Sequence, residues 1–175
     1  QAQWYTFEPV DYGEVLRGTE IAFGQPLLPT PDLEKIDCLL VLDSDCLGIE
    51  LDSLMQVRRF ARRRQGPPQQ FNRLYVVEST GTLTGFMADH RLRLPASLVG
   101  AFLLALTREL SPSLPGKLPE LPARVDEASG RELPESARRW LAPLARDLLR
   151  HRGRCAILPG YRQPAYVHAL AHTLN

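Results

Sequence analysis

Short groups of acidic and hydroxyl side chains directly follow two apolar runs of the chain, at positions 38–42 and 74–77. The residues in these groups are Asp43, Ser44, Glu78, Ser79 and Thr80. A carboxylate at such a position can accept hydrogen bonds from the hydroxyl groups of a ribose, as acidic residues do in dinucleotide-binding proteins. The other interpretation of Glu78 is a carboxylate that caps a helix or braces a loop. The sequence leaves both interpretations open.

Two other pairs of side chains have spacings that catalytic or metal-binding residues use. Asp43 and Asp45 are two residues apart and would share a face if the strand continued through them, but a turn is the alternative. His168 and His172 are four residues apart on an expected helix. They lack the acidic partner of a metalloprotease motif, and packing against a sheet or a partner is the alternative. We therefore predict no catalytic residue and no metal ligand, and we do not expect the chain to catalyse a reaction by itself.

Two further clusters have the composition of anion-binding segments. Thr80, Thr82 and Thr84 are interleaved with glycines, which is typical of a loop whose backbone N–H groups cradle an anion, or of a plain turn. Five arginines lie between positions 58 and 64 and form the basic cluster of the chain. The formal net charge is nevertheless only +1, which argues against a dedicated nucleic-acid-binding protein. We expect no nucleic-acid partner, and we expect the arginines to form a solvated helix face or to meet an acidic partner.

Apolar runs separated by amphipathic segments must position these side chains. The runs at 38–42, 74–77 and 155–158 are apolar throughout rather than alternating, as strands buried on both faces of a parallel sheet require. Helical patterns lie between these runs, and this alternation predicts an α/β fold. The expected architecture is a Rossmann-like, doubly wound, mainly parallel sheet with helices on both faces. The carboxyl ends of its strands would form the ligand-binding edge.

One domain is expected to contain all of these elements. Residues 1–110 would form the first βα units, with a short strand at 4–7 and a short outer strand at 91–94. Residues 111–134 contain five prolines and predict a surface excursion or linker. Residues 135–175 would complete the same domain with a helix, a strand and a helix.

Two of the expected helices have features of their own. Leu54 and Val57 have the spacing of an amphipathic helix over Leu51–Arg64, with the arginines elsewhere on its surface. The helix expected over 135–151 contains Pro143, where we predict a kink or a break, because proline removes a backbone hydrogen bond and clashes with the preceding turn.

Several classes of protein are excluded by what the sequence lacks. The three cysteines have no CxxC spacing, so the chain shows no iron–sulfur or zinc signature. No apolar run approaches the roughly 20 residues that cross a membrane, so we expect no direct membrane span. There is no GxGxxG and no GxxxxGK[ST], so the usual dinucleotide and P-loop motifs are missing.

The stretch Asn72–Pro95 resembles the strand–loop–strand of the molybdopterin oxidoreductase (DMSO reductase) superfamily. In that superfamily a buried strand ends in an acidic residue, a threonine-rich loop follows, and an Ala-Asp pair precedes a short strand that ends in Leu-Pro. The corresponding positions here are Glu78, Ala88-Asp89 and Leu94-Pro95. The resemblance implies a Rossmann-like fold and a place in a larger oxidoreductase.

Within this superfamily the chain is most similar to a divergent branch, the molybdopterin-like iron–sulfur subunit of alternative complex III, a quinol-oxidising membrane complex. The segments that carry this likeness are Glu8-Pro9-Val10, Ala22-Phe23-Gly24, Ala88-Asp89-His90-Arg91-Leu92 and Val167-His168-Ala169-Leu170-Ala171-His172. Three contact loops depart from the pattern of members that bind the pterin cofactor. These loops are Asp43-Ser44-Asp45-Cys46, Glu78-Ser79-Thr80 and Pro95-Ala96-Ser97.

The resemblance implies a non-catalytic structural domain of a respiratory electron-transfer subunit. Such a domain would bind no cofactor itself, and iron–sulfur clusters would lie elsewhere in the parent protein. Its partners would be other domains and subunits of a membrane-associated complex, on the periplasmic side of the bacterial cytoplasmic membrane. The alternative is a domain that binds molybdopterin guanine dinucleotide in a true molybdenum oxidoreductase. Its contacts would then be Asp43, Ser44, Glu78, Ser79 and Thr80.

Overall fold

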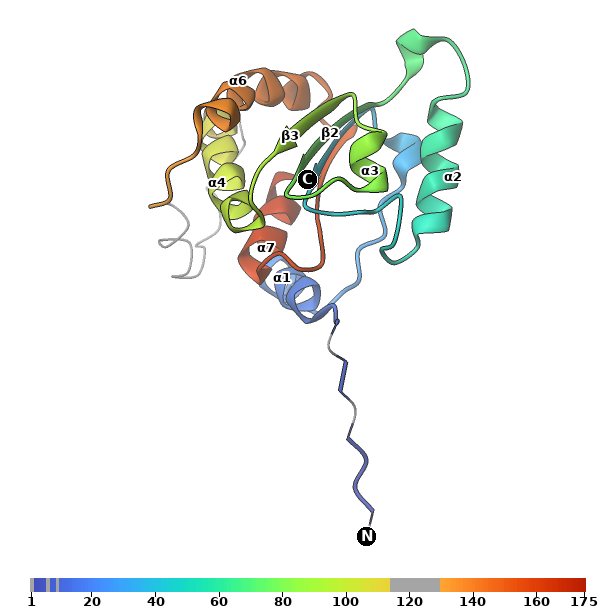
Figure 1. The fold of residues 1–175 in the computed structure, drawn as a ribbon, viewed down its shortest axis with the longest axis vertical. Helices are drawn as coiled ribbons and strands as arrows, with labels where there is room; N and C mark the ends of the chain where they lie inside the picture. The colour runs from blue at the N-terminus through green and yellow to red at the C-terminus, as the bar shows by residue number, and fades with distance from the viewer. Residues whose placement is uncertain (1, 6, 9, 114–129) are drawn as a thin grey trace.

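The computed structural model describes residues 2–5, 7–8, 10–113 and 130–175, and its centre is a four-stranded parallel sheet (Figure 1). The strands are β1 (Cys38–Leu42), β2 (Arg73–Glu78), β3 (His90–Arg93) and β4 (Cys155–Pro159), in the order β3-β2-β1-β4. β1 is fully buried between β2 and β4, which explains why its sequence is apolar at every position. The predicted α/β fold with a parallel sheet is confirmed, as is the outer strand after position 90.

Helices surround this sheet and bury both of its faces. The α-helices are α1 (Gly13–Phe23), α2 (Ser53–Arg63), α3 (Leu83–Phe86), α4 (Val99–Leu110), α6 (Glu135–Arg150) and α7 (Ala165–Leu174). Short 3-10 helices are η1 (Leu33–Lys35), η2 (Pro68–Gln70), η3 (Ala96–Leu98) and η4 (Ser111–Ser113). Figure 1 shows α4, α6 and α7 on one side of the sheet and α2 on the other. α1 packs against α7.

Two apolar cores follow from this layering. Alternate residues of one strand enter different cores, since side chains of a strand point to opposite faces. Leu40 and Leu42 of β1 enter the larger core with α4, α6 and α7. Leu39 and Val41 enter the smaller core, which η1 closes with Leu33. The ends of β1, β2 and β4 are thereby fixed beside one another at the carboxyl edge of the sheet.

The amphipathic helix α2 turns its apolar stripe away from the sheet. Leu54 is 87% exposed, whereas Gln56 and Phe60 are buried. Polar contacts with the segment around η1 fix this orientation. Gln56 Nε2 and Arg59 Nη1 both donate to the Pro31 carbonyl, at 3.1 and 3.0 Å. These bonds hold the side of α2 that contains Gln56 and Arg59 against the segment around Pro31, so the stripe that includes Leu54 faces solvent.

The structure contradicts the strand expected at 4–7 and the break that was one of the two alternatives at Pro143. Residues 4, 5 and 7 form no strand and extend away from the body of the molecule; residue 6 lies outside the described residues (Figure 1). α6 continues through Pro143 as one helix. Pro143 lies on its exposed side, while Leu141 and Leu144 on either side of it are buried against the larger core. Packing therefore holds both halves of the helix in place despite the proline.

The proline-rich segment is described only in part, because 114–129 of the predicted 111–134 excursion lie outside the described residues. Within the residues that the structure does describe, no helix has both the length and the apolar composition to cross a bilayer.

Candidate functional site at the carboxyl edge of the sheet

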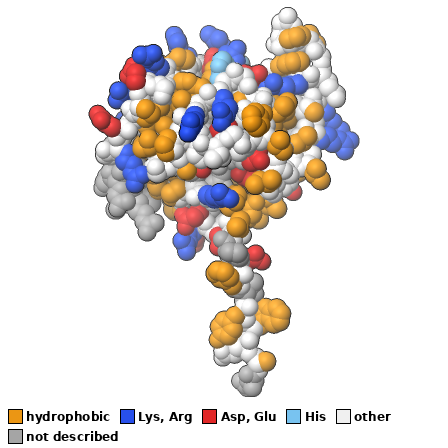
Figure 2. Space-filling view, viewed as in Figure 1, with side chains coloured by type: hydrophobic (Ala, Val, Ile, Leu, Met, Phe, Trp, Pro, Cys, Tyr) orange, Lys and Arg blue, Asp and Glu red, His pale blue; other side chains and the backbone are white. Residues whose placement is uncertain are grey.

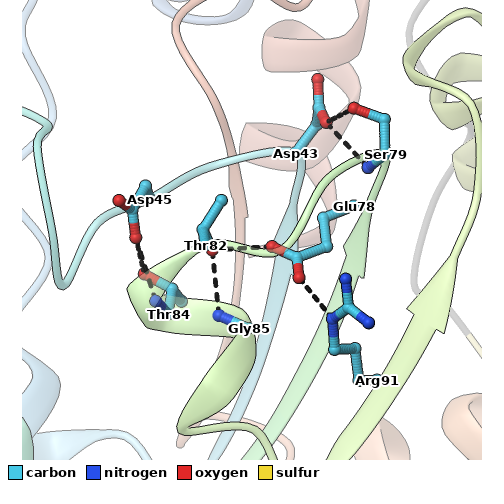
Figure 3. Close-up of polar contacts among 8 residues, drawn as sticks. All are labelled: Asp43, Asp45, Glu78, Ser79, Thr82, Thr84, Gly85 and Arg91. Atoms are coloured by element: carbon cyan, nitrogen blue, oxygen red, sulfur yellow. Dashed lines mark hydrogen bonds and ion pairs between the residues drawn. The ribbon is translucent and has the colours of Figure 1, made fainter.

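Asp43 joins the ends of three strands at the carboxyl edge of the sheet. Its backbone adopts a positive φ of 52°, which ends β1 in a tight turn rather than continuing the strand. Its Oδ1 accepts hydrogen bonds from the N–H and hydroxyl of Ser79, at 3.3 and 3.1 Å (Figure 3). Its Oδ2 accepts from Gln163 Nε2 at 3.1 Å, in the loop after β4. The sequence left two alternatives for Asp43 and Asp45, a shared strand face or a turn, and the structure forms the turn.

Glu78, at the end of β2, is only 1% exposed and is occupied by its own chain. One carboxylate oxygen forms an ion pair with Arg91 of β3, and the other accepts a 2.7 Å bond from the hydroxyl of Thr82 (Figure 3). A Cβ at Gly85 would lie 1.9 Å from the Glu78 carboxylate, so the chain needs glycine there. This geometry corresponds to the loop-bracing interpretation of Glu78.

The threonine-rich segment that follows is also turned inward. It forms the short helix α3, which Thr82 caps by accepting a 3.0 Å bond from the Gly85 N–H. The N–H and hydroxyl of Thr84 donate to Asp45 Oδ1 at 2.9 and 2.8 Å (Figure 3). These donors are used within the fold, so of the two alternatives for this segment the N–H groups of Thr84 and Gly85 correspond to the plain turn rather than to an anion cradle. Thr80 is exposed at the surface.

Ser44 lies apart from the other predicted contact residues. It is buried, and its hydroxyl donates a 2.9 Å bond to Glu50, which also accepts the Asp45 N–H at 2.8 Å. Burial raises the pKa of the Glu50 carboxyl, and the hydrogen bonds from Asp45 and Ser44 oppose this effect. No pattern in the sequence marks Glu50, because it follows a loop rather than a strand.

A cavity of about 550 Å³ opens at the same edge, beside this network. Asp43 and Ser79 line it, whereas Glu78 and Ser44 do not. Two arginines that sequence reasoning missed, Arg131 and Arg162, also line it. Arg131 lies within the proline-rich segment 111–134, for which the sequence predicts only a surface excursion or linker. Guanidinium groups on a cavity wall can bind phosphate oxygens in pairs.

The crevice between β1 and β4, where the strand order changes direction, is closed by the protein. The Gly160 N–H donates to the Leu42 carbonyl at 2.8 Å. A Cβ at position 160 would lie 2.0 Å from the backbone oxygen of Asp43, so only glycine fits. Ligands of doubly wound sheets usually enter such a crevice. Here the two backbones meet in it, and the open cavity lies beside it.

The remaining candidates lie elsewhere. His168 and His172 are on α7 facing α1, and within the described residues no group of three potential ligands could hold a metal ion.

Most of the arginine cluster is paired with acidic residues of the same chain. These pairs are Arg59–Asp32, Arg62–Glu34, Arg63–Asp37 and Arg64–Asp89. The cluster therefore fastens α2 to its neighbours.

No protein-family model and no curated protein matches the sequence of this chain.

Proposed function

We propose that this chain is a non-catalytic structural domain of a molybdopterin-oxidoreductase-like subunit in a respiratory, quinol-oxidising electron-transfer complex. The observation that carries the proposal is the occupied carboxyl edge. Asp43 and Glu78 accept hydrogen bonds from their own chain at both carboxylate oxygens, and Asp45 accepts them at Oδ1. Glu78 is also fully buried, so it is not accessible to the hydroxyl groups of a ribose. The resemblance of residues 72–95 supports the identity of the parent subunit.

The surface formed by α2, α3 and the loop before α2 supports a role in assembly. We call it the α2–α3 apolar surface, and its exposed members are Ile49, Leu54, Leu83, Phe86 and Met87. Leu54 is 87% exposed and Phe86 is 77% exposed. Figure 2 shows hydrophobic side chains gathered on this side of the molecule. Apolar surface of this kind marks contact sites with other proteins. Sister domains or subunits of the complex, on the periplasmic side of the membrane, are the proposed partners.

Charged substitutions on this surface test the assembly role. The wild-type chain should self-associate at high concentration, and Leu54→Glu with Phe86→Glu should return it to a monomer in sedimentation experiments. Val10→Glu, which changes an exposed side chain on the extended N-terminal segment, is the matched control. The free energy of unfolding should change by no more than about 0.5 kcal/mol in any of these variants, because the residues are exposed. A wild type that stays monomeric, or a Val10 variant with the same effect, would count against this surface.

A second candidate function is the binding of molybdopterin guanine dinucleotide. The cavity of about 550 Å³, with Asp43, Ser79, Arg131 and Arg162 on its wall, favours it. Thermal unfolding with GMP, GDP and extracted pterin–guanine dinucleotide separates the two functions. A ligand at 100 times its Kd would stabilise the fold by about 2.7 kcal/mol. The structural function predicts no shift.

The cavity arginines provide the control for this experiment. A shift that Arg162→Ala removes and Arg146→Ala retains would establish nucleotide binding and overturn the non-catalytic proposal. Arg146 is an exposed arginine of α6 and does not line the cavity.

A further inference from the structure

A second cavity, of about 430 Å³, lies between β4, α7, α1 and the loop around residues 28–36. We call it the β4–α7 cavity. It shares no lining residue with the cavity at the carboxyl edge, and its wall is mainly apolar. Its volume is within the range of small-molecule sites, which are apolar clefts with a few convergent polar groups. The polar groups on its wall therefore determine what it can bind.

His168 lines this cavity and contains a ring nitrogen without a hydrogen-bond partner among the described residues. The side chain is 2% exposed, and its Nε2 is buried without a hydrogen-bond partner among the described residues. Burial lowers the pKa of the ring, and the backbone of Gln163 and Gly160 opposes this effect, as expected where a ring N–H faces backbone carbonyls. Because Nε2 has no partner, the donor is Nδ1. Nε2 then carries a lone pair and acts as an acceptor.

Gln56 supplies a second bare acceptor from another element. It is 3% exposed and lies on α2, and it lines the same cavity. Its Nε2 donates a hydrogen bond to the Pro31 carbonyl at 3.1 Å, while its Oε1 is buried and has no partner within the described part of the chain. His172 Nε2 is in the same condition, with its ring against Phe23 at 5.2 Å. Three polar side chains from two helices, each with one buried atom that has no partner among the described residues, thus line one cavity.

Unpaired acceptors of this kind are costly, since each loses its hydration on burial and gains no hydrogen bond in return. The mainly apolar wall favours an uncharged ligand, and the charged groups on it disfavour an anion. Burial and the neighbouring His172 lower the pKa of His168 to about 4, so the ring is neutral at pH 7. The cations on the wall are already paired, Lys35 with Asp32 at 3.3 Å and Arg154 with Asp37.

We infer that the β4–α7 cavity binds an uncharged, mainly apolar small molecule whose hydroxyl or N–H groups donate hydrogen bonds to His168 Nε2 and Gln56 Oε1. The apolar wall would contact the body of such a molecule, and the acceptors would select it over hydrocarbons of the same shape. This inference is independent of the structural role proposed for the carboxyl edge.

A pair of probes that differ in one hydrogen-bond donor tests the inference. 4-Ethylphenol carries a hydroxyl donor, and 4-ethylanisole has a methyl ether in its place. In ¹⁵N NMR of the imidazole groups, 4-ethylphenol should shift the Nε2 resonance of His168 from the lone-pair position toward that of a hydrogen-bonded nitrogen. 4-Ethylanisole should bind about tenfold more weakly, which corresponds to about 1.4 kcal/mol for one hydrogen bond.

Variants assign the effect to the cavity. His168→Phe should remove the preference for the phenol, because the single hydroxyl of this probe donates to one acceptor, whereas His90→Phe, on β3 outside the cavity, should leave it unchanged. The NMR shift of the wild type remains decisive if His168→Phe does not fold. Equal binding of both probes, no shift at His168, or ordered waters on both acceptors that neither probe displaces would overturn the inference.

Discussion

The carboxyl edge of the sheet and the β4–α7 cavity contain polar groups in opposite states. At the edge, Glu78 is buried and both carboxylate oxygens have partners. In the cavity, His168 and Gln56 are about as deeply buried, yet each has one side-chain atom without a partner in the described part of the chain. A buried polar group that is satisfied by its own chain stabilises the fold, whereas an unsatisfied one stays available to a ligand. Whether a buried polar atom has a partner therefore distinguishes a structural group from a binding group better than its burial or its residue type does.

Breaking the Arg91–Glu78 pair should have the largest effect. Arg91→Met leaves the Glu78 carboxylate buried without its cation and should lower the free energy of unfolding by roughly 3–5 kcal/mol. Glu78→Gln should cost less, about 1–2 kcal/mol, because the amide can still accept from Thr82 and the Arg91 side chain is 35% exposed to water. Urea unfolding of the two variants measures the difference. Equal, small costs would mean that the edge network is not structural.

Filling the space between β1 and β4 should have the next largest effect. Gly160→Ala places a methyl group 2.0 Å from the Asp43 carbonyl, a backbone atom that cannot rotate away, and should destabilise the fold by about 3 kcal/mol. Gly24→Ala is the control, since its Cβ would meet open space and only its positive φ of 75° opposes the substitution. It should cost only about 1 kcal/mol. Thermal and urea unfolding compare them, and similar losses would show that the close contact at Gly160 is unimportant.

The pH dependence of stability should reflect the burial of His168 beside the β4–α7 cavity. Burial, with His172 as the second cause, lowers the pKa of His168 from 6.5 to about 4. Between these values the unfolded chain binds the proton and the folded chain does not, so stability falls as pH falls from 6.5 toward 4. The total loss from His168 should be about 3 kcal/mol. Urea unfolding of wild type and His168→Gln at several pH values isolates the contribution of His168. If the unfolding free energies of the two proteins change with pH in the same way, the prediction is wrong.

The smallest expected effect is the difference in unfolding free energy between two substitutions, one at a satisfied buried group and one at an unsatisfied one. Thr84→Val removes the acceptor of the Leu47 N–H, a 2.9 Å bond, and should cost about 2 kcal/mol. Gln56→Met removes an unpaired oxygen together with one bond to Pro31 and should stay within about 1 kcal/mol of wild type. Unfolding free energies of the pair test this order, and a larger loss for Gln56→Met would reverse the comparison.

Local sequence patterns predicted the sheet because burial on both faces leaves a direct mark on composition. The apolar runs at β1, β2 and β4 identified these strands, and the polar residues after each run lie at one edge, as expected. The same patterns misjudged the side chains beyond the strands. The orientation of α2 depends on the Pro31 carbonyl, which no periodicity in the helix encodes. Pro143 does not break α6, because packing on both sides of it outweighs the missing hydrogen bond.

The sequence by itself determined the fold class and the grouping of Asp43, Ser79 and Glu78 at the ends of neighbouring strands. Tertiary structure alone decided that Glu78 pairs with Arg91, that Gly160 closes the crevice, and that Gln56 and His168 line one cavity. Strand burial is a repeated, local property, so it can be found in a short window of sequence. The partner of a buried polar atom is a single contact between distant segments, and it is fixed only when the layers pack.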